Sequence, residues 1–325
     1  MLITRFVFIF LLISSNLVSQ NLKFKPLTTK DGLSNNSVSD IISDNDGRIW
    51  IATWDGLNIY NGNNITVFKH KIADTLSLSG NVVINFIKDK NGEIWIRTDN
   101  NSVSKYIGNG KFKNFHFKKQ LNGLYLSKDS IPIVLLDSMY YTLSDKEQLA
   151  LPKYSHTPLG NKKYEALKRN FLKKEPNIKI NDILLDSKDN IWYATESNGL
   201  YFKSGTSNSN NLSFQHYTFD VYAPYSLSTN EIECVYEDAF GNIWLGYKDG
   251  GLSMVYNESQ QITTILPHPT KQPNLPKGTI RAITKDDNQT LWLGYYSNGL
   301  VYRLNSENYF LPYKIKEANS NPDWN

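Results

Sequence analysis

The residue types that could carry out chemistry do not form a catalytic or metal-binding pattern in this sequence. The paired acids Glu231 and Glu233 flank the start of an expected strand, where solvation or turn hydrogen bonds explain them. No glycine-rich loop that could hold a phosphate occurs. The five histidines are scattered, and no two have the spacing of a metal-binding pair: His70, His116, His156, His216 and His268. We therefore expect no catalytic residue, no metal site and no cofactor.

Residues at one recurring hairpin position could instead bind a ligand. Trp54 lies four residues after Trp50, and the residues at the same place in other copies of a repeated motif differ in type. Packing therefore does not dictate the residue there, and a binding surface could form. Aromatic faces beside polar groups suit a carbohydrate, because sugar C–H faces stack while hydroxyls need hydrogen bonds. The expected surface consists of Trp54, Asp55, Asp99, Glu196, Tyr247, Lys248, Tyr295 and Tyr296.

A repeated unit must position these hairpin tips. The segment 46–60 (DGRIWIATWDGLNIY) recurs along the chain in degraded but legible form. Its tryptophans are Trp50, Trp95, Trp192, Trp244 and Trp292, which step by 45, 97, 52 and 48 residues. The long step holds two units, one of them degraded and centred near Tyr141. A period of about 40 to 50 residues is typical of a repeat architecture.

Agreement between the copies extends beyond the tryptophan. An aspartate stands six residues before each one: Asp44, Asp89, Asp186, Asp238 and Asp286. A β-branched residue stands twelve before, and a leucine stands seventeen before in four of the five copies. The aspartate can accept hydrogen bonds from backbone N–H groups of a tight turn.

Each unit has the pattern of four short strands. In the first copy the apolar runs are 38–42, 49–53, 57–60 and 65–68, separated by turns rich in Asn, Asp and Gly. Such a pattern predicts an antiparallel meander, and a four-stranded sheet per repeat is a β-propeller blade. The repeated tryptophans are better interpreted as fillers of the wedge between blades than as sugar platforms. We predict an all-β propeller with six recognisable blades, the third degenerate, within a seven-bladed ring.

The segments outside the repeats have separate interpretations. Residues 1–20, with an apolar run at 6–13 and Arg5 as the only charge, predict a signal peptide, the alternative being an uncleaved anchor. The propeller then spans 21–325, and the run 22–27 is expected to complete the last blade. The Lys-rich segment 164–172 predicts a short helix between blades, with nucleic-acid or membrane contact as the alternative.

The end of the chain and its composition complete this picture. Residues 309–314 are expected to form an outer strand, and 317–325 resemble the linker before a further blade. The net charge of +4 comes from balanced numbers of basic and acidic residues. The single cysteine, Cys234, cannot form a disulfide within a monomer and is expected to be buried.

The combined motif resembles the two-component regulator propeller repeat. It is carried by 31–38 (DGLSNNSV), Asp44 and 47–60, and the resemblance spans nearly all of the expected mature chain. It implies a periplasmic sensor propeller of a Bacteroidetes-type hybrid two-component system, often tuned to oligosaccharides. In such proteins, propellers precede a transmembrane helix, a histidine kinase and a receiver. No kinase motif occurs in this sequence, so kinase activity is not expected of it.

The implied function is an exported ligand-sensing module that responds to oligosaccharides. Its expected partners are an oligosaccharide ligand, the remaining blades and signalling domains of the same regulator, and a second copy in a homodimer, but not nucleic acid. Two alternatives stay open, since a propeller fold alone does not settle function. One is a free-standing secreted propeller that serves as a protein-binding scaffold. The other is a propeller hydrolase or lyase.

Overall fold

A computed structural model describes residues 23–127, 130–137, 139–143, 168–205, 214–223, 225–267 and 275–304. The described residues form six antiparallel sheets, which we number as blades 1 to 6 in chain order. Blade 1 holds β2 (Val38–Ser43), β3 (Ile49–Thr53), β4 (Gly56–Tyr60) and β5 (Ile65–Phe68). Blade 2 holds β6 (Val83–Lys88), β7 (Ile94–Thr98), β8 (Ser102–Tyr106) and β9 (Phe112–His116). Blade 3 holds β10 (Leu121–Leu126), β11 (Pro132–Leu136) and β12 (Met139–Thr142).

The second half of the chain continues the same order. Blade 4 holds β13 (Ile180–Leu185), β14 (Ile191–Thr195), β15 (Leu200–Lys203) and β16 (Gln215–Tyr217). Blade 5 holds β17 (Ile232–Glu237), β18 (Ile243–Tyr247), β19 (Leu252–Val255) and β20 (Ile262–Ile265). Blade 6 holds β21 (Ile280–Lys285), β22 (Leu291–Tyr295) and β23 (Leu300–Leu304), with β1 (Lys23–Leu27) as its outer strand.

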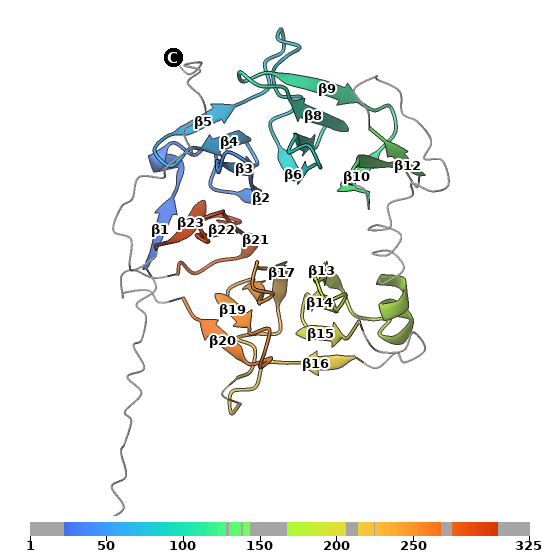
Figure 1. The fold of residues 1–325 in the computed structure, drawn as a ribbon, viewed down its shortest axis with the longest axis vertical. Coiled ribbons are helices and arrows are strands. Elements are labelled where there is room, and N and C mark those ends of the chain that lie inside the picture. The colour runs from blue at the N-terminus through green and yellow to red at the C-terminus, as the bar shows by residue number, and fades with distance from the viewer. Residues whose placement is uncertain are drawn as a thin grey trace, which may run out of the picture.

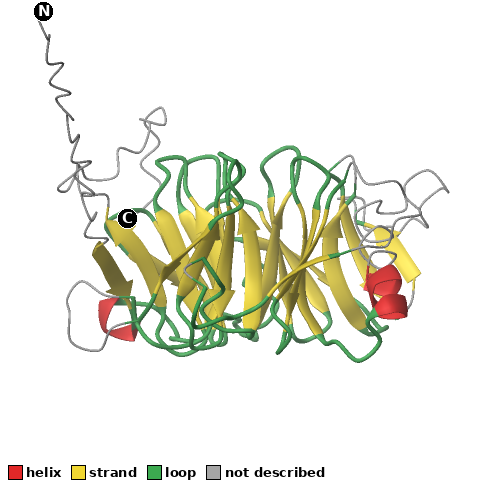
Figure 2. Cartoon of the chain, turned by 90° about the horizontal axis from the view of Figure 1, so that it is seen from below, coloured by secondary structure: helices red, strands yellow, loops and turns green. Residues whose placement is uncertain are grey.

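The six blades are arranged around a common axis, with the first strand of each blade innermost (Figure 1). Seen from the side, the strands run through the thickness of a disc and the loops lie on its two faces (Figure 2). The all-β propeller predicted from the repeat is therefore confirmed. The strand pairs of blade 3 also agree with the expected degenerate copy, since β11 and β12 pair without a central tryptophan.

The ring closes between blades 1 and 6 through the N-terminal strand. β1 pairs antiparallel with β23 from Lys23 opposite Leu304 to Leu27 opposite Leu300, as the sequence predicts. Blades 1 and 6 also pack directly, because Val38 and Ile41 share an apolar cluster with Ala282 and Trp292. Among the described residues, blades 1 and 6 therefore meet directly at this junction, with no further blade between them.

The repeated aspartate and tryptophan hold the first turn of five of the six blades. Asp286 shows the pattern: one carboxylate oxygen accepts the N–H groups of Asn288 and Thr290 at 2.9 Å, and the other accepts the indole N–H of Trp292 at 2.9 Å. The indole bond recurs in the other four copies at 2.7 to 3.0 Å. The five tryptophans are 0–4% exposed and belong to apolar clusters. Their role as wedge fillers is confirmed.

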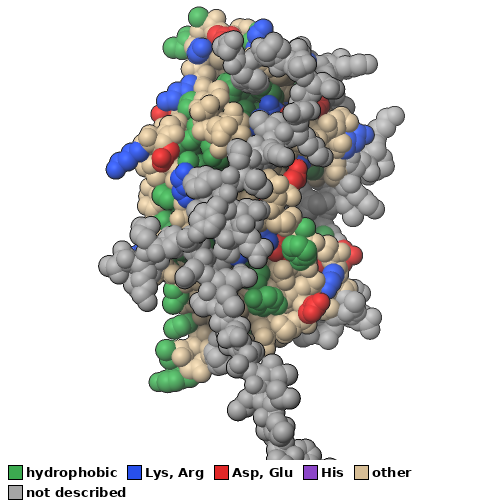
Figure 3. All heavy atoms as spheres, turned by 60° about the vertical axis from the view of Figure 1, so that its left-hand side comes forward, with side chains coloured by type: hydrophobic (Ala, Val, Ile, Leu, Met, Phe, Trp, Pro, Cys, Tyr) green, Lys and Arg blue, Asp and Glu red, His purple; other side chains and the backbone are tan. Residues whose placement is uncertain are grey.

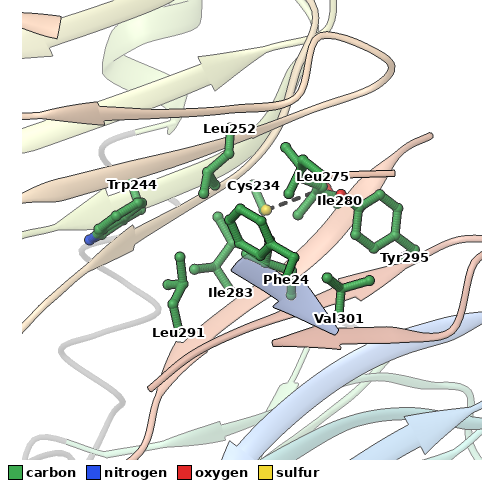
Figure 4. Close-up of a cluster of buried hydrophobic side chains, with 11 residues drawn as sticks. Phe24, Cys234, Trp244, Leu252, Leu275, Ile280, Ile283, Leu291, Tyr295 and Val301 are labelled. Atoms are coloured by element: carbon green, nitrogen blue, oxygen red, sulfur yellow. Dashed lines mark hydrogen bonds between the residues drawn. The ribbon is translucent and has the colours of Figure 1, made fainter. Parts of the chain in front are cut away.

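Apolar clusters shared by neighbouring blades fill the wedges. Figure 4 shows the cluster between blades 5 and 6, where Phe24 of β1 lies beside Cys234 and Ile280. Cys234 is buried as expected, and its thiol donates to the carbonyl oxygen of Ile280 at 3.4 Å. Blade 4 differs on one side, where its apolar face packs against the short helix 168–174. Phe171 of that helix is fully buried and stacks on Tyr193, with ring centroids 4.5 Å apart.

Several expectations concern residues that the structure does not describe. The signal peptide at 1–20, the outer strand at 309–314 and the linker at 317–325 lie outside the described residues, as does the first part of the expected helix at 164–172. Within the described part of the chain, no helix combines the length and apolarity needed to cross a membrane.

Candidate ligand-binding site

The tips between the second and third strands of the blades lie at equivalent places on one face of the disc, which we call the tip face. In five blades, the tip residue four positions after the tryptophan donates its backbone N–H to the carbonyl just before the innermost strand. The pairs are Trp54 to Ser37, Asp99 to Val82, Glu196 to Lys179, Lys248 to Glu231 and Tyr296 to Thr279, at 2.9 to 3.2 Å. The backbone thus fixes each tip, while the side chain is free to vary in type.

Trp54 and Tyr296 are the predicted site residues that the structure brings into direct contact. Their rings meet edge to face with centroids 5.4 Å apart and an interplanar angle of 82°. The contact bridges blades 1 and 6, next to the junction that β1 closes. Both rings stay accessible, with 45% of Trp54 and 38% of Tyr296 exposed. An exposed aromatic pair with fixed backbone positions is a suitable platform for the apolar face of a sugar.

Arg281 adds a cation to this pair. It is the second residue of β21 and is exposed to solvent. Its guanidinium carbon lies 4.3 Å from the centroid of the Tyr296 ring, which is a cation–π contact. We call Trp54, Tyr296 and Arg281 together the aromatic–arginine site.

The other charged tip residues form ion pairs close to their own tips. Lys69 contacts Asp55 at 2.7 Å, Lys179 contacts Glu196 at 2.5 Å, and Lys248 lies 3.7 Å from Glu231. Each of these pairs is solvent-exposed, so it contributes little to stability. Asp99 is also exposed at its tip. The structure therefore places Asp55, Asp99, Glu196 and Lys248 on the expected face, without direct contact to the Trp54–Tyr296 pair in the described interactions.

Tyr247 and Tyr295 were predicted to belong to the surface, and this prediction is wrong. Both are the last residues of their strands and are 0% exposed. The Tyr247 hydroxyl donates to Ser253 Oγ at 3.0 Å, and the Tyr295 hydroxyl donates to the Pro276 carbonyl at 3.2 Å. They occupy the strand position that holds buried threonines in other blades, such as Thr53. They are core residues beneath the tips.

Two carboxylates lie on innermost strands, Asp40 on β2 and Asp182 on β13, and we call them the axis carboxyls. Asp40 of β2 accepts the Phe86 N–H of blade 2 at 2.8 Å, and Asp182 of β13 accepts the Val235 N–H of blade 5 at 3.0 Å. Burial raises the pKa of each of these carboxyls to about 6, and the hydrogen bonds from backbone N–H groups offset only part of this effect. Both carboxylates tie neighbouring blades together and are satisfied by protein donors.

Arg97 on the second strand of blade 2 also departs from the repeat. It stands in β7 where other blades have a small residue, such as Ala52 or Gly246. A side chain at Gly246 would collide with Cys234 on the innermost strand of its own blade and with Ile280 on the innermost strand of blade 6. The Arg97 guanidinium instead reaches blade 3 and donates to the Leu121 carbonyl at 2.8 Å. Burial lowers the pKa of Arg97.

No group of three or more metal-ligating side chains occurs within the described ranges of the chain. The histidines there bond locally: His70 to the Leu78 carbonyl, His116 to Ser102 Oγ, and His216 to the Asn198 carbonyl. His156 and His268 lie outside the described residues. A shallow pocket of about 340 Å³ lies on the outer rim between β16 and β20, away from the tips. Its lining includes His216, Tyr225 and Ile262.

Sequence reasoning missed Arg281, although a signal was present. The second residue of the innermost strand is variable between copies, being Ser39, Ile84, Asn122, Asn181, Glu233 and Arg281. A comparison of the six copies at that position would have shown that the fold does not fix the residue type there. Its contact with Tyr296 joins a strand to a tip and cannot be read from spacing alone.

A model of the two-component regulator propeller family matches residues 32–55, 77–100 and 226–249. A histidine kinase, P4, of Formosa agariphila is 39% identical to the chain over 72 residues, which are 22% of this chain and 5% of that protein. The extracellular domain of a putative hybrid two component system from B. thetaiotaomicron is 18% identical, with a TM-score of 0.51. That alignment covers 88% of this chain and 42% of that one. A gluconolactonase from Xanthomonas campestris matches at 10% identity and a TM-score of 0.51, covering 87% of this chain and 90% of that one.

The two structural likenesses show a shared fold, because both identities are low. This chain spans less than half the length of the kinase relative and of the two-component extracellular domain. The three matched segments coincide with the turn, the innermost strand and the tryptophan strand of blades 1, 2 and 5. The chain is therefore a β-propeller in which three segments match the model of the two-component regulator propeller family.

Proposed function

We propose that this chain is an exported ligand-sensing propeller of a two-component sensor regulator, and that its ligand is an oligosaccharide bound at the tip face. The family repeats and the likeness to an extracellular two-component domain support the sensor assignment. The periplasmic or cell-surface location follows from the signal peptide predicted at 1–20. The signalling domains belong to the remainder of such a regulator, and a second copy is the partner through which a signal would be passed on.

The observation that carries the ligand proposal is the exposed Trp54–Tyr296 pair. Both rings stay partly exposed, and backbone hydrogen bonds at their own residues fix their positions. A sugar ring stacked on them would bury apolar C–H groups, and its hydroxyls could reach the neighbouring charged tips. On the face drawn in Figure 3, acidic and basic side chains of the described residues are interspersed, and no continuous basic patch is seen. Such a surface does not favour a polyanionic nucleic acid.

The test is binding of the purified propeller to a panel of neutral and acidic oligosaccharides, followed by calorimetry on each ligand that binds. The proposal expects at least one oligosaccharide to bind, and expects the double variant Trp54→Ala/Tyr296→Ala to lose that binding while it keeps the wild-type melting temperature. Binding that the double variant retains in full would contradict the proposed site. A panel in which nothing binds would contradict the oligosaccharide assignment.

A protein-binding scaffold is a second candidate because one outer loop exposes apolar side chains. Phe219, Val221 and Tyr222 follow β16 and are 48%, 72% and 93% exposed. An exposed apolar patch on a soluble domain often marks a protein contact. The variant Tyr222→Ser separates the two functions, since it should weaken a protein complex and leave oligosaccharide binding unchanged.

A further inference from the structure

Arg281, the cation of the aromatic–arginine site, differs from the other cations near the tips in its carboxylate partners. The Lys69, Lys179 and Lys248 ammonium groups each lie within 4.0 Å of a carboxylate. No carboxylate of the described residues lies within that distance of the Arg281 guanidinium. Glu233, at the equivalent position of the neighbouring innermost strand, forms no such pair with it either. The site therefore presents one positive charge that the described protein does not neutralise.

The fold does not require this arginine. The same strand position holds serine, isoleucine, asparagine or glutamate in other blades, and Arg281 is exposed. Its contact with Tyr296 does not fill a core or close a turn. A residue that the repeat does not demand, beside an exposed aromatic pair at the junction of two blades, is explained by what it can bind.

The geometry also defines which groups Arg281 can bind. The Arg281 guanidinium lies over the Tyr296 ring, and a guanidinium carries its N–H donors along its planar edge. Those donors match two oxygens of a carboxylate or sulfate in a bidentate hydrogen bond. The Trp54 ring meets the same tyrosine edge to face, so that a sugar on the rings and an anionic group on the guanidinium lie within one ligand's reach.

We infer that the aromatic–arginine site selects an acidic oligosaccharide, with Trp54 and Tyr296 stacking on a sugar ring and Arg281 binding its carboxylate or sulfate. This inference rests on the proposed function and narrows its ligand class. Asp55 lies beside Trp54 but is neutralised by Lys69, so that it does not oppose an anion there. A carboxylated sugar and a sulfated sugar would both supply the anionic group, and the experiment distinguishes between them.

The experiment titrates the propeller with three matched sets of probes by calorimetry. The first set is oligogalacturonate and its methyl ester, which have the same rings with and without the carboxylate charge. The second is a sulfated galactan oligosaccharide and its desulfated form. The third is a panel of neutral oligosaccharides. We expect one charged member to bind at least about tenfold more tightly than its neutral form, because a charge-assisted hydrogen bond contributes more than a neutral one. The pair that shows this difference identifies the anionic group.

Variants assign the difference to Arg281. Arg281→Ala should bind the charged and neutral members equally, and Arg281→Lys should recover only part of the difference because lysine lacks the planar fork. Arg169→Ala, an exposed arginine on the helix 168–174 at blade 4, is the matched control and should behave as wild type. The difference should also shrink as salt is raised, since the site is exposed.

Two results would overturn the inference while the proposed function stands. One is tight binding of neutral oligosaccharides with no preference for any charged member. The other is a preference for charged members that Arg281→Ala retains. If no probe of any set binds, both the inference and the oligosaccharide assignment fail.

Discussion

The Trp54 indole and the Tyr296 ring meet edge to face, 5.4 Å apart, across the junction where the ring of blades closes. Trp54 belongs to blade 1 and Tyr296 to blade 6, so the contact exists only when β1 and β23 have joined the ends of the array. The same event that completes the fold therefore assembles the candidate site. A ligand that spans the two rings would also link the first and last blades.

Single substitutions at this pair should lower ligand affinity without harming the fold. Trp54→Ala and Tyr296→Ala should each weaken oligosaccharide binding by about three- to tenfold, because each removes one stacking contact. The melting temperature should stay near that of the wild type, since both side chains are substantially exposed. Calorimetry and thermal unfolding measure the two effects. Tyr222→Ala, which removes a tyrosine that is 93% exposed on the outer rim, is the matched control. Equal losses in all three variants would contradict a specific site.

The aspartate of each first turn should be essential for stability. Asp286→Ala removes the acceptor for two backbone N–H groups and the buried Trp292 indole, and should cost about 2 to 4 kcal/mol of the free energy of unfolding. The neighbouring Asp287→Ala removes an exposed carboxylate and should change it by less than about 0.5 kcal/mol. Urea denaturation measures both. Equal stabilities would show that the aspartate's hydrogen bonds are dispensable.

Closure of the ring should depend on β1. Phe24 is 5% exposed within the cluster of blades 5 and 6, so that Phe24→Ala should destabilise the protein by about 3 to 5 kcal/mol. Lys25→Ala changes the next, exposed residue of the same strand and should have little effect. Because the Trp54–Tyr296 contact bridges the same junction, Phe24→Ala should also weaken ligand binding at temperatures where the rest of the ring is folded. Unchanged stability in Phe24→Ala would contradict the closure role of β1.

The carboxyls of Asp40 and Asp182 should make stability depend on pH. Their pKa values are about 6 in the folded protein and near 3.8 when unfolded, so the folded state holds more protons between these values. Their contribution to stability is therefore fully present below about pH 4 and is lost as the pH rises through about 6. The double variant Asp40→Asn/Asp182→Asn should show a shallower fall in unfolding free energy from pH 4 to 7 than the wild type.

Asp249→Asn, at an exposed tip, provides the control for this pH dependence. Its unfolding free energy should follow the wild-type curve in parallel. If the unfolding free energy of the double variant also runs parallel to that of the wild type between pH 4 and 7, the assignment of the pH dependence to the axis carboxyls is contradicted.

The blade itself could be predicted from the sequence because its signals are local. The strands expected at 49–53 and 65–68 are β3 and β5 with the same bounds, since apolar runs and Asn-Gly turns define them. The acceptor role of the repeated aspartate was also predicted. The hydrogen bond from the tryptophan indole to this aspartate was not predicted. It joins a turn to a strand, and residue spacing does not give the relative placement of the two.

The candidate site could be predicted only in part. Tip residues such as Trp54 and Tyr296 were found because the position varies between copies. Tyr247 and Tyr295 each directly precede a tip residue and were wrongly assigned to the surface. Their hydroxyl groups bond to residues of other elements, so the sequence does not reveal that they are buried. The seventh blade was expected because the linker-like pattern at 317–325 is local. Among the described residues, blades 1 and 6 pack directly on each other, and this tertiary contact cannot be read from the local pattern.

The most direct test of ligand binding at the tip face is ¹⁹F NMR of the protein labelled with 5-fluorotryptophan. The sequence contains seven tryptophans, five of which are the buried wedge residues, and Trp54→Phe identifies the Trp54 resonance. Addition of an oligosaccharide that binds should shift or broaden the Trp54 resonance and leave the five wedge resonances in place. A ligand that binds with the Trp54 resonance unchanged would contradict the account.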